Sequence, residues 1–264
     1  METIRNHGRD VLTQDELVAA LAGGGRFAGA AFTVSLDFED LDCGETKFED
    51  CTFDGLVLHG TDFAGASFVN CRFSRVRFAN CRFPGASFRR CVFFDADTKA
   101  GCTFAFCAMP EAALTDCNFA DTTFDRCDLY AVTGTGCSFR GAKFKGSRFE
   151  KTLSRKVILT KANFARCNFS FADLSGVSLR TCELTDCKFA ETLFWDADLT
   201  EAVLKDSVID RAEWDRARLR DADLRGASIA GLNLALLADY AGLKISGSQS
   251  HELLREIGID VSPD

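Results

Sequence analysis

A five-residue periodicity between residues 51 and 93 constrains the fold of this chain more than any other feature. Each fifth residue is Phe or Leu, and the residue two places before it is usually a small one, Cys, Ala, Val or Thr. The large residues are Phe53, Leu58, Phe63, Phe68, Phe73, Phe78, Phe83, Phe88 and Phe93. A helix would scatter these side chains around its surface, and a strand would send them alternately to both faces. The pattern therefore indicates a backbone that turns a corner every five residues.

Four such corners close a square coil of about 20 residues, and successive coils stack at the strand spacing of about 4.8 Å. Each coil of such a solenoid contacts only its neighbours. We therefore predict an all-β solenoid, a quadrilateral β-helix over residues 26–234 with loops near 94–101 and 150–156. We expect residues 1–25 to form an N-terminal capping helix and residues 235–264 a C-terminal helical cap or dimerisation segment.

The composition agrees with an interior built largely from one kind of side chain, since the chain has 25 Phe but only two Trp and two Tyr.

Its net charge of −8 argues against direct binding to nucleic acid. No apolar run is long enough to predict a transmembrane helix. The N-terminus also lacks the basic and then apolar pattern of a signal peptide. We therefore expect a cytoplasmic protein without a membrane partner.

The 13 cysteines fit the repeat rather than a disulfide framework. Only Cys43 takes a large position, and the others take the small position: Cys51, Cys71, Cys81, Cys91, Cys102, Cys107, Cys117, Cys127, Cys137, Cys167, Cys182 and Cys187. Residues 20 apart should stack, which predicts the ladders Cys51/71/91, Cys107/127, Cys117/137 and Cys167/187. The coil spacing would permit bridges. We expect reduced thiols that pack as small apolar groups, because the setting is cytoplasmic.

The sequence gives no sign of a catalytic or metal site. We find no nucleophile–base pair, no phosphate-binding loop and no CxxC motif, and His7, His59 and His251 lie near no Cys pair. A carboxylate pair such as Asp196 and Asp198 is common on any acidic rod. We therefore expect no enzyme activity, no cofactor and no metal.

Two interruptions of the repeat predict loops. After Phe93 the next clear large position is Phe104, eleven residues on rather than ten, so one extra residue should bulge within 94–101. At the second break, 150–156, Ser154 stands where Phe or Leu is due, and Leu159 returns in register. From Leu159 to Leu234 the pattern is the most regular, and the large positions shift from Phe to Leu or Ile.

The second interruption coincides with a basic stretch. Nine cations face Glu150 alone between residues 140 and 166: Arg140, Lys143, Lys145, Arg148, Lys151, Arg155, Lys156, Lys161 and Arg166. Such a stretch on a solenoid is often only solvated surface. Its coincidence with a break in the repeat favours a contact loop.

The termini read as helical caps, which solenoid ends require. Thr13 and Glu16 have the spacing of a capping box, and this helix either covers the first coil or binds a partner. Residues 248–257 read as a helix with Ser248 or Ser250 as N-cap and Gly258 just beyond its end. An apolar rod end is either a monomer cap or a self-complementary dimer patch. The surplus of apolar residues there favours a dimer.

The repeat resembles the pentapeptide-repeat family, whose fold is a right-handed quadrilateral β-helix, from about Phe38 to Leu234. The breaks resemble those of the quinolone-resistance proteins of the Qnr group, which is related to the mycobacterial protein MfpA. The matching stretches are 93–104, 149–159, Leu243-Lys-Ile and 252–264. That resemblance implies binding to bacterial DNA gyrase and topoisomerase IV, with protection from fluoroquinolones. It also implies a dimer joined through C-terminal elements, a rod that imitates duplex DNA, and loops that contact the enzyme.

Carried over by position, the resemblance assigns three sets of residues. The contact loops would present Asp95, Asp97, Lys99, Lys151, Ser154, Arg155 and Lys156. An acidic face, which would imitate DNA locally because the net charge is modest, would hold Asp196, Asp198, Glu201, Asp206, Asp210, Glu213 and Asp215. The dimer surface would include Tyr240, Leu243, Leu253, Leu254 and Ile257. The alternative hypothesis is an interaction scaffold with a different protein partner.

Overall fold

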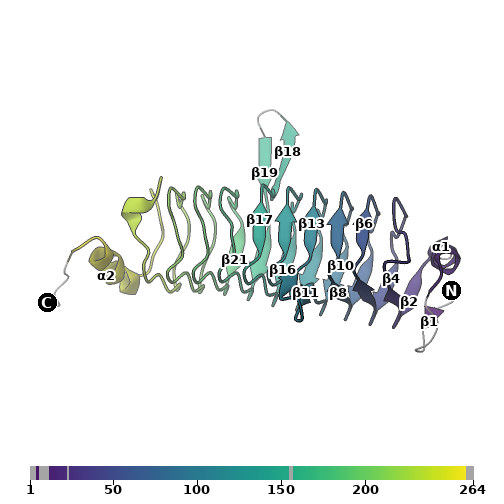
Figure 1. Ribbon diagram of the computed structural model, residues 1–264. Coiled ribbons are helices and arrows are strands. Elements are labelled where there is room, and N and C mark those ends of the chain that lie inside the picture. The colour runs from purple at the N-terminus through teal and green to yellow at the C-terminus, as the bar shows by residue number, and fades with distance from the viewer. Residues whose placement is uncertain (1–3, 6–11, 23, 155–156, 260–264) are drawn as a thin grey trace.

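The protein is a straight rod of stacked coils with a helix at each end (Figure 1). The computed structural model describes residues 4–5, 12–22, 24–154 and 157–259. Within these residues, no helix combines the length and the apolar composition that spanning a bilayer requires. The β-solenoid fold predicted from the repeat is confirmed.

Four sides make up the rod, and three of them carry parallel strands in register. Side 1 is a nine-stranded sheet of β1 (Ile4–Arg5), β2 (Arg26–Ala28), β4 (Lys47–Glu49), β7 (Ser67–Val69), β10 (Ser87–Arg89), β14 (Ala113–Thr115), β16 (Thr133–Thr135), β20 (Asn163–Ala165) and β21 (Glu183–Thr185). Side 2 holds β3 (Ala31–Phe32), β5 (Thr52–Asp54) and β8 (Arg72–Ser74).

The remaining sides complete the square. Side 3 holds β6 (Val57–His59), β9 (Arg77–Ala79), β13 (Thr103–Ala105), β15 (Thr123–Asp125) and β17 (Lys143–Lys145). Side 4 is built from isolated bridges such as Asp42↔Asp62 and Asp198↔Arg218. Two antiparallel hairpins interrupt the coils: β11 (Phe94–Asp95) with β12 (Ala100–Gly101), and β18 (Glu150–Ser154) with β19 (Val157–Thr160).

Phenylalanine rings fill the shaft of the rod. Rings of one side stack on each other, as Phe73 does on Phe93 with centroids 4.5 Å apart and planes 2° apart. Rings of adjacent sides meet edge to face, as Phe68 and Phe73 do. Both arrangements are favourable for aromatic quadrupoles. Towards the C-terminus the stacks give way to aliphatic side chains and to Trp214, which stacks on Phe194.

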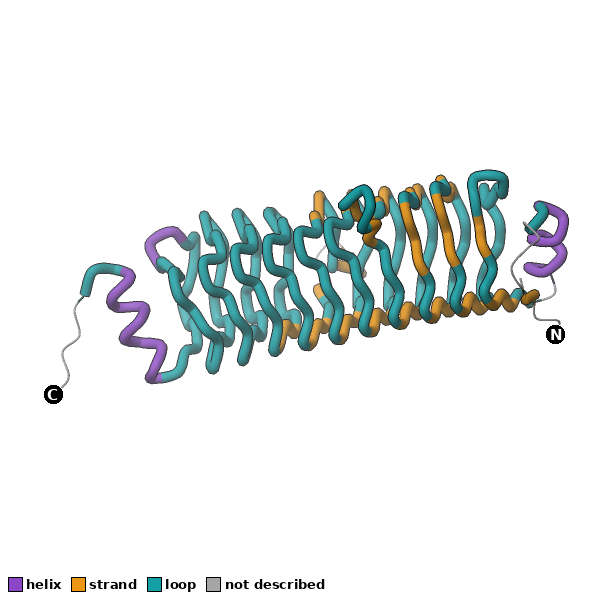
Figure 2. The backbone as a smooth tube through the Cα atoms, turned by 60° about the horizontal axis from the view of Figure 1, so that its bottom comes forward, coloured by secondary structure: helices purple, strands orange, loops and turns teal. Residues whose placement is uncertain are grey.

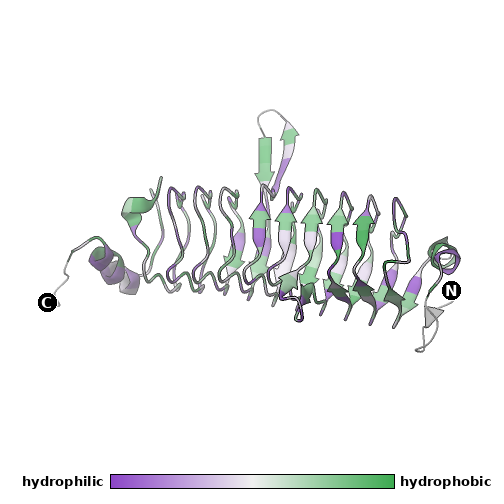
Figure 3. Cartoon of the chain, in the orientation of Figure 1, coloured by the Kyte–Doolittle hydropathy of each residue, from purple (hydrophilic) through white to green (hydrophobic). Residues whose placement is uncertain are grey.

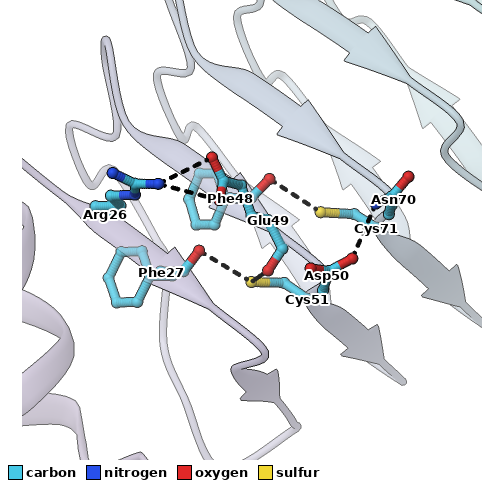
Figure 4. Close-up of polar contacts among 8 residues, drawn as sticks. All are labelled: Arg26, Phe27, Phe48, Glu49, Asp50, Cys51, Asn70 and Cys71. Atoms are coloured by element: carbon cyan, nitrogen blue, oxygen red, sulfur yellow. Dashed lines mark hydrogen bonds and ion pairs between the residues drawn. The ribbon is translucent and has the colours of Figure 1, made fainter. Parts of the chain in front are cut away.

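The described cysteines are all free and buried, as the repeat predicted. Most of these thiols donate to a backbone carbonyl, as Cys51 does to Phe27 and Cys71 to Phe48 (Figure 4). Burial raises the pKa of Cys102 and Cys182 to about 12, so these thiols stay neutral. Three of the predicted ladders join into one column between sides 1 and 2, since the backbone N–H of Cys91 donates to Cys117 Sγ across a step of 26 residues.

The first insertion is longer than predicted. Phe104 pairs with Phe78, a step of 26 residues, whereas Phe68 pairs with Phe88 at 20. Phe104 therefore follows Phe93 on the very next side of the coil, and the chain carries six extra residues rather than one. The prediction was wrong because it assumed that one regular repeat lay between these two phenylalanines.

The second insertion is also longer than predicted, and Leu159 is not an interior residue. Phe164 pairs with Gly134, a step of 30 residues against the regular 20. The insertion therefore spans ten residues and covers both β18 and β19. Because ten is a multiple of five, Leu159 kept the numerical register of the repeat while lying on the hairpin, where its side chain is exposed.

Both ends of the rod are covered by helices (Figure 2). The capping box of α1 (Gln14–Ala22) is confirmed: the N–H of Thr13 donates to Glu16 Oε2, and that of Glu16 to Thr13 Oγ1. At the other end, the 3₁₀ helix η1 (Leu234–Leu236) precedes α2 (Gly247–Glu256). The N-cap of α2 is Ser246 rather than Ser248 or Ser250, because Gln249, three residues on, accepts from the Ser246 N–H.

Candidate partner-binding surface

The first hairpin, β11–β12, is a compact polar turn. Asp95 Oδ1 accepts from the N–H groups of Asp97 and Thr98 at 2.9 and 3.1 Å. These donors hold the pKa of Asp95 below its usual range. Lys99 takes the left-handed backbone conformation that closes the turn, with φ of 54°. Asp97 and Lys99 are exposed, so the predicted contact residues of this loop do lie at its surface.

The first hairpin lies against side 2 and walls a cavity of about 420 Å³. Asp95 and Asp97 line it from the hairpin, and Arg72 and Arg75 line it from the rod. Arg75 is already engaged, because its guanidinium donates to both carboxylate oxygens of Asp54. The hairpin therefore has a polar inner face and leaves little apolar surface for a partner.

The second hairpin, β18–β19, stands away from the rod, and β19 and the outer end of β18 are apolar (Figure 3). Four large apolar side chains on it are between 41% and 58% exposed: Leu153, Val157, Ile158 and Leu159. The strands pair only with each other, so neither joins a sheet of the rod. A two-stranded ribbon with such exposure is marginal alone and typical of an interaction site.

The base of the second hairpin is fixed to the rod by a cation–π contact. Lys151 Nζ lies 5.5 Å from the ring centre of Tyr130, which belongs to the preceding coil. Ser154, another predicted contact residue, ends β18 and is exposed. The predicted residues Arg155 and Lys156 lie outside the described residues.

The two hairpins leave the rod at opposite corners. The first is inserted between Phe93 on side 2 and Phe104 on side 3. The second is inserted between Phe149 on side 4 and Phe164 on side 1. Figure 1 accordingly shows β18–β19 above the rod and β11 below it. One flat partner surface on one side of the rod therefore cannot cover both hairpins.

The predicted acidic face is not one face, which corrects the sequence-based assignment. A step of five residues carries the chain to the next side, so seven acids within 196–215 must surround the rod. Asp196 and Asp215 share the corner between sides 3 and 4, whereas Asp206 lies on the corner between sides 1 and 2. The others are spread likewise: Asp198 on side 4, Glu201 between sides 4 and 1, Asp210 between sides 2 and 3, and Glu213 on side 3.

Several of these carboxylates are already paired. Both oxygens of Asp196 accept from Arg216 at 2.7 and 2.6 Å, which lowers the pKa of this aspartate. Asp198 forms an ion pair with Arg180 at 3.2 Å. The acidic charge of the C-terminal coils is therefore partly neutralised and distributed around the rod.

The C-terminal residues divide into an inner and an outer set. Leu253 is buried against the last coil, and the Gln249 amide donates to Leu224 and Ala227 carbonyls at 2.7 Å each. Tyr240 and Ile257 are 48% and 46% exposed. The half-buried predicted residues are Leu243 and Leu254. Of the five predicted dimer residues, Leu253 thus serves the cap of its own chain.

Sequence reasoning missed three exposed aromatic side chains, Phe106, Phe171 and Trp195, which are between 41% and 50% exposed. They occupy corner positions, where the repeat is otherwise mostly polar or small. A search of the corner positions for aromatic residues would have found them. Among the described residues, no group of three or more His, Cys, Asp or Glu could hold a metal ion.

Comparison with protein families agrees with this geometry. Models described as pentapeptide repeats match residues 48–92, 71–153, 155–180 and 182–213. The chain is a pentapeptide-repeat protein. Comparison with curated protein sequences gave no match.

This pentapeptide-repeat protein resembles solved structures of QnrB1, described as a plasmid-mediated fluoroquinolone resistance protein. For a trypsin-treated form the TM-score is 0.73 at 22% identity, covering 80% of this chain and 99% of QnrB1. For the full-length form the TM-score is 0.72, also at 22% identity, covering 79% and 97%. The likeness shows that the two proteins share a fold over nearly the whole of QnrB1.

Proposed function

We propose that this protein binds a bacterial type II topoisomerase, DNA gyrase or topoisomerase IV, and protects it from fluoroquinolones without catalysing a reaction. The observation that carries the proposal is the projecting apolar hairpin β18–β19, placed on a rod that shares its fold with a fluoroquinolone resistance protein. We further propose that the protein acts in the cytoplasm and needs no cofactor.

The second hairpin supplies the apolar part of the contact. Burying a side chain such as Ile158 or Leu153 in a partner contributes roughly 1.5–3 kcal/mol each. Lys151 and Lys161 at the base of the hairpin add positive charge beside the apolar surface. The partner site should therefore be an apolar depression with acidic residues at its rim.

The rod supplies shape rather than a continuous negative field. Its acids surround the C-terminal coils, and part of them are neutralised by arginines. We propose that unpaired acids such as Glu201, Asp206 and Asp215 occupy sites that DNA phosphates would otherwise take. The contribution of each should be small and should fall with added salt, because these groups are exposed.

The C-terminal end supplies the contact with a second copy of the chain. Tyr240 and Ile257 remain exposed after α2 has closed the last coil. We propose that they form the self-complementary contact of a dimer, with Leu243 and Leu254 at its edge. The protein's mass in solution, measured by light scattering, should then be twice that of the 28.9 kDa chain.

A supercoiling assay tests the function directly. Purified gyrase inhibited by ciprofloxacin should regain supercoiling when this protein is added, and a variant without residues 151–156 should restore less. No rescue at any concentration, together with no binding to the gyrase subunits, would remove the proposal.

The second candidate is an interaction scaffold for another protein, and the apolar hairpin would serve that role equally well. Capture from a bacterial lysate on the immobilised protein distinguishes the two. Recovery of gyrase or topoisomerase IV subunits supports the first function, and reproducible recovery of a different single partner supports the second. A variant with Ile158→Asp should lose the partner in either case.

A further inference from the structure

The two edges of the second hairpin differ in charge. β18 carries Glu150 and Lys151, whereas β19 has the sequence Val-Ile-Leu-Thr over 157–160, without a charged residue. Sheet edges in soluble proteins are commonly protected from further pairing by charged residues, and by lysine above all. By this criterion the edge of β18 is protected and the edge of β19 is open to another strand.

β19 also has the composition of a strand from the middle of a sheet. Its side chains alternate between two faces, with Val157 and Leu159 on one face and Ile158 on the other. These three side chains are 44%, 41% and 58% exposed, respectively. Strands that are apolar on both faces normally lie between other elements. β19 has β18 on one edge and, among the described residues, no strand on the other.

The pairing register shows which backbone groups of β19 are free to bind another strand. Antiparallel pairs alternate between residues that exchange two backbone hydrogen bonds and residues whose N–H and C=O point outward. The Lys161 N–H donates to the Phe149 carbonyl at 3.0 Å, so this is a bonded pair. Along the ladder from this pair, Leu159 bonds with β18, whereas Ile158 and Thr160 direct their N–H and C=O groups away from it.

The rod closes the lower part of this edge and leaves the upper part open. The Thr160 carbonyl accepts from the hydroxyl of Thr181, on the next coil, at 3.1 Å. Ile158 lies two residues farther along the hairpin, and outside the ladder no backbone hydrogen bond joins it to another described residue. Figure 1 shows β19 on the C-terminal side of the projecting hairpin. The open edge therefore faces towards the C-terminal end of the rod.

We propose that the open edge of β19 pairs with an extended strand of the topoisomerase, which joins the hairpin as a third strand. This inference rests on the proposed function and names the partner element at that contact: an exposed edge strand that is uncharged and apolar at its centre. The Ile158 N–H donates to a carbonyl of that strand, and the Ile158 carbonyl accepts from one of its N–H groups. The alternative occupant is β19 of a second copy. Continuity with the proposed apolar contact of Leu153 and Ile158 favours the enzyme.

Amide hydrogen exchange tests the strand pairing directly. Exchange of the full chain would be measured alone and with saturating gyrase, and resolved to single amides by mass spectrometry. We expect the Ile158 amide, which points outward in the free chain, to exchange at least about tenfold more slowly in the complex.

The Thr152 amide is the matched control, because it points outward on the other edge of the hairpin, directly opposite Ile158. Its exchange rate should change by less than about threefold. If gyrase binds but slows both amides equally, or does not slow Ile158, the strand pairing is overturned and the proposed function stands. If gyrase does not bind, both are removed.

Proline variants test the same backbone bond by affinity for gyrase. Ile158→Pro removes the outward N–H without removing a hydrogen bond of the hairpin, and proline is tolerated at such edge positions. Calorimetry should show binding at least about tenfold weaker. Ile158→Val keeps the N–H, and Thr152→Pro changes the other edge, so each should weaken binding by no more than about threefold. Equal losses from Ile158→Pro and either control contradict the pairing.

Two measurements on the free variants separate binding from folding and from self-association. The Leu159 amide, which bonds with β18, should exchange as slowly in both proline variants as in the parent chain, because the hairpin stays paired. Where a proline variant opens the hairpin, the exchange measurement on the parent chain decides. Light scattering should give the same mass for Ile158→Pro and the parent chain. A lower mass for Ile158→Pro would assign the edge of β19 to a second copy and overturn the proposal.

Discussion

The two hairpins of this rod arise from the same kind of event, an insertion at a corner, yet they differ in almost every physical property. The first is closed by its own Asp95 and lies against side 2 beside Arg75. The second projects from the opposite corner and exposes Leu153 and Ile158. Sequence position and length made both look like contact loops. The exposed apolar surface of the second hairpin suits it to bind a partner strongly. The first hairpin lacks such a surface and packs against the rod.

The difference shows how a regular solenoid acquires a specific site. A coil of the rod exposes mostly polar groups, so its sides offer little apolar area to a partner. Inserting ten residues leaves every interior residue in its register while adding an element that makes no contribution to the core. Such an element is free to vary with the partner, and its loss should not unfold the rod.

The largest expected effect comes from removing the second hairpin. Residues 150–161 would be replaced by Ala-Gly, the pair that turns the same corner at Ala64 and Gly65. We expect protection of gyrase to fall by about two orders of magnitude, because several buried apolar side chains are lost from the contact. The melting temperature should change by only a few degrees. Collapse of the fold would show instead that the hairpin stabilises the rod.

A smaller effect is expected from one charge on the same hairpin. Ile158→Asp places a carboxylate in the apolar contact and should weaken partner binding about 10- to 100-fold, measured by calorimetry. Val57→Asp is the matched control, because Val57 is 66% exposed on side 3, whereas β18–β19 leaves the rod at the corner between sides 4 and 1. Equal losses from the two variants would mean that binding is not localised to β18–β19.

Shortening the first hairpin should matter less. Residues 94–101 would be replaced by Ala-Asp, as at Ala120 and Asp121 on the same corner. We expect protection to change by no more than about threefold, since this turn exposes no large apolar side chain. A loss as great as that of the second-hairpin deletion would remove the distinction between the two.

The smallest effect concerns the internal order of the first hairpin. The Thr98 and Asp97 N–H groups favour the charged form of Asp95 and depress its pKa. That contribution is present at neutral pH and is lost as the pH falls through the depressed folded-state pKa. Asp95→Asn should therefore speed hydrogen exchange within 94–101 at neutral pH and less so in strong acid. Exchange in β18–β19 should not change.

Much of the fold followed from the sequence, because one constraint repeats along it. Phe53 and Phe73 had to stack once the corner came every five residues, and the buried cysteines followed from the same rule. Leu159 escaped this reasoning because an insertion of ten residues is invisible to a period of five. The acidic residues escaped it for the opposite reason, since neighbours in sequence are carried to different sides of the coil.

The exposed aromatics could be located by sequence only after the corners were known. Phe106 and Phe171 are ordinary phenylalanines in a chain with 25 of them. A left-handed backbone angle and an arginine on the adjacent coil set these two residues apart, and the contact of Arg140 with Phe171 depends on the exact length of the second insertion. Local pattern predicts the shaft of the rod, whereas the long-range register decides its surface.

Direct measurement of binding between purified gyrase and two forms of this chain tests the central claim most sharply. The full chain and the form with Ala-Gly in place of residues 150–161 would be compared by calorimetry at one salt concentration. We predict submicromolar binding for the full chain and a dissociation constant at least about 100-fold higher for the shortened form, with unchanged circular dichroism. Equal affinity of two folded forms would contradict the assignment of β18–β19 as the principal contact.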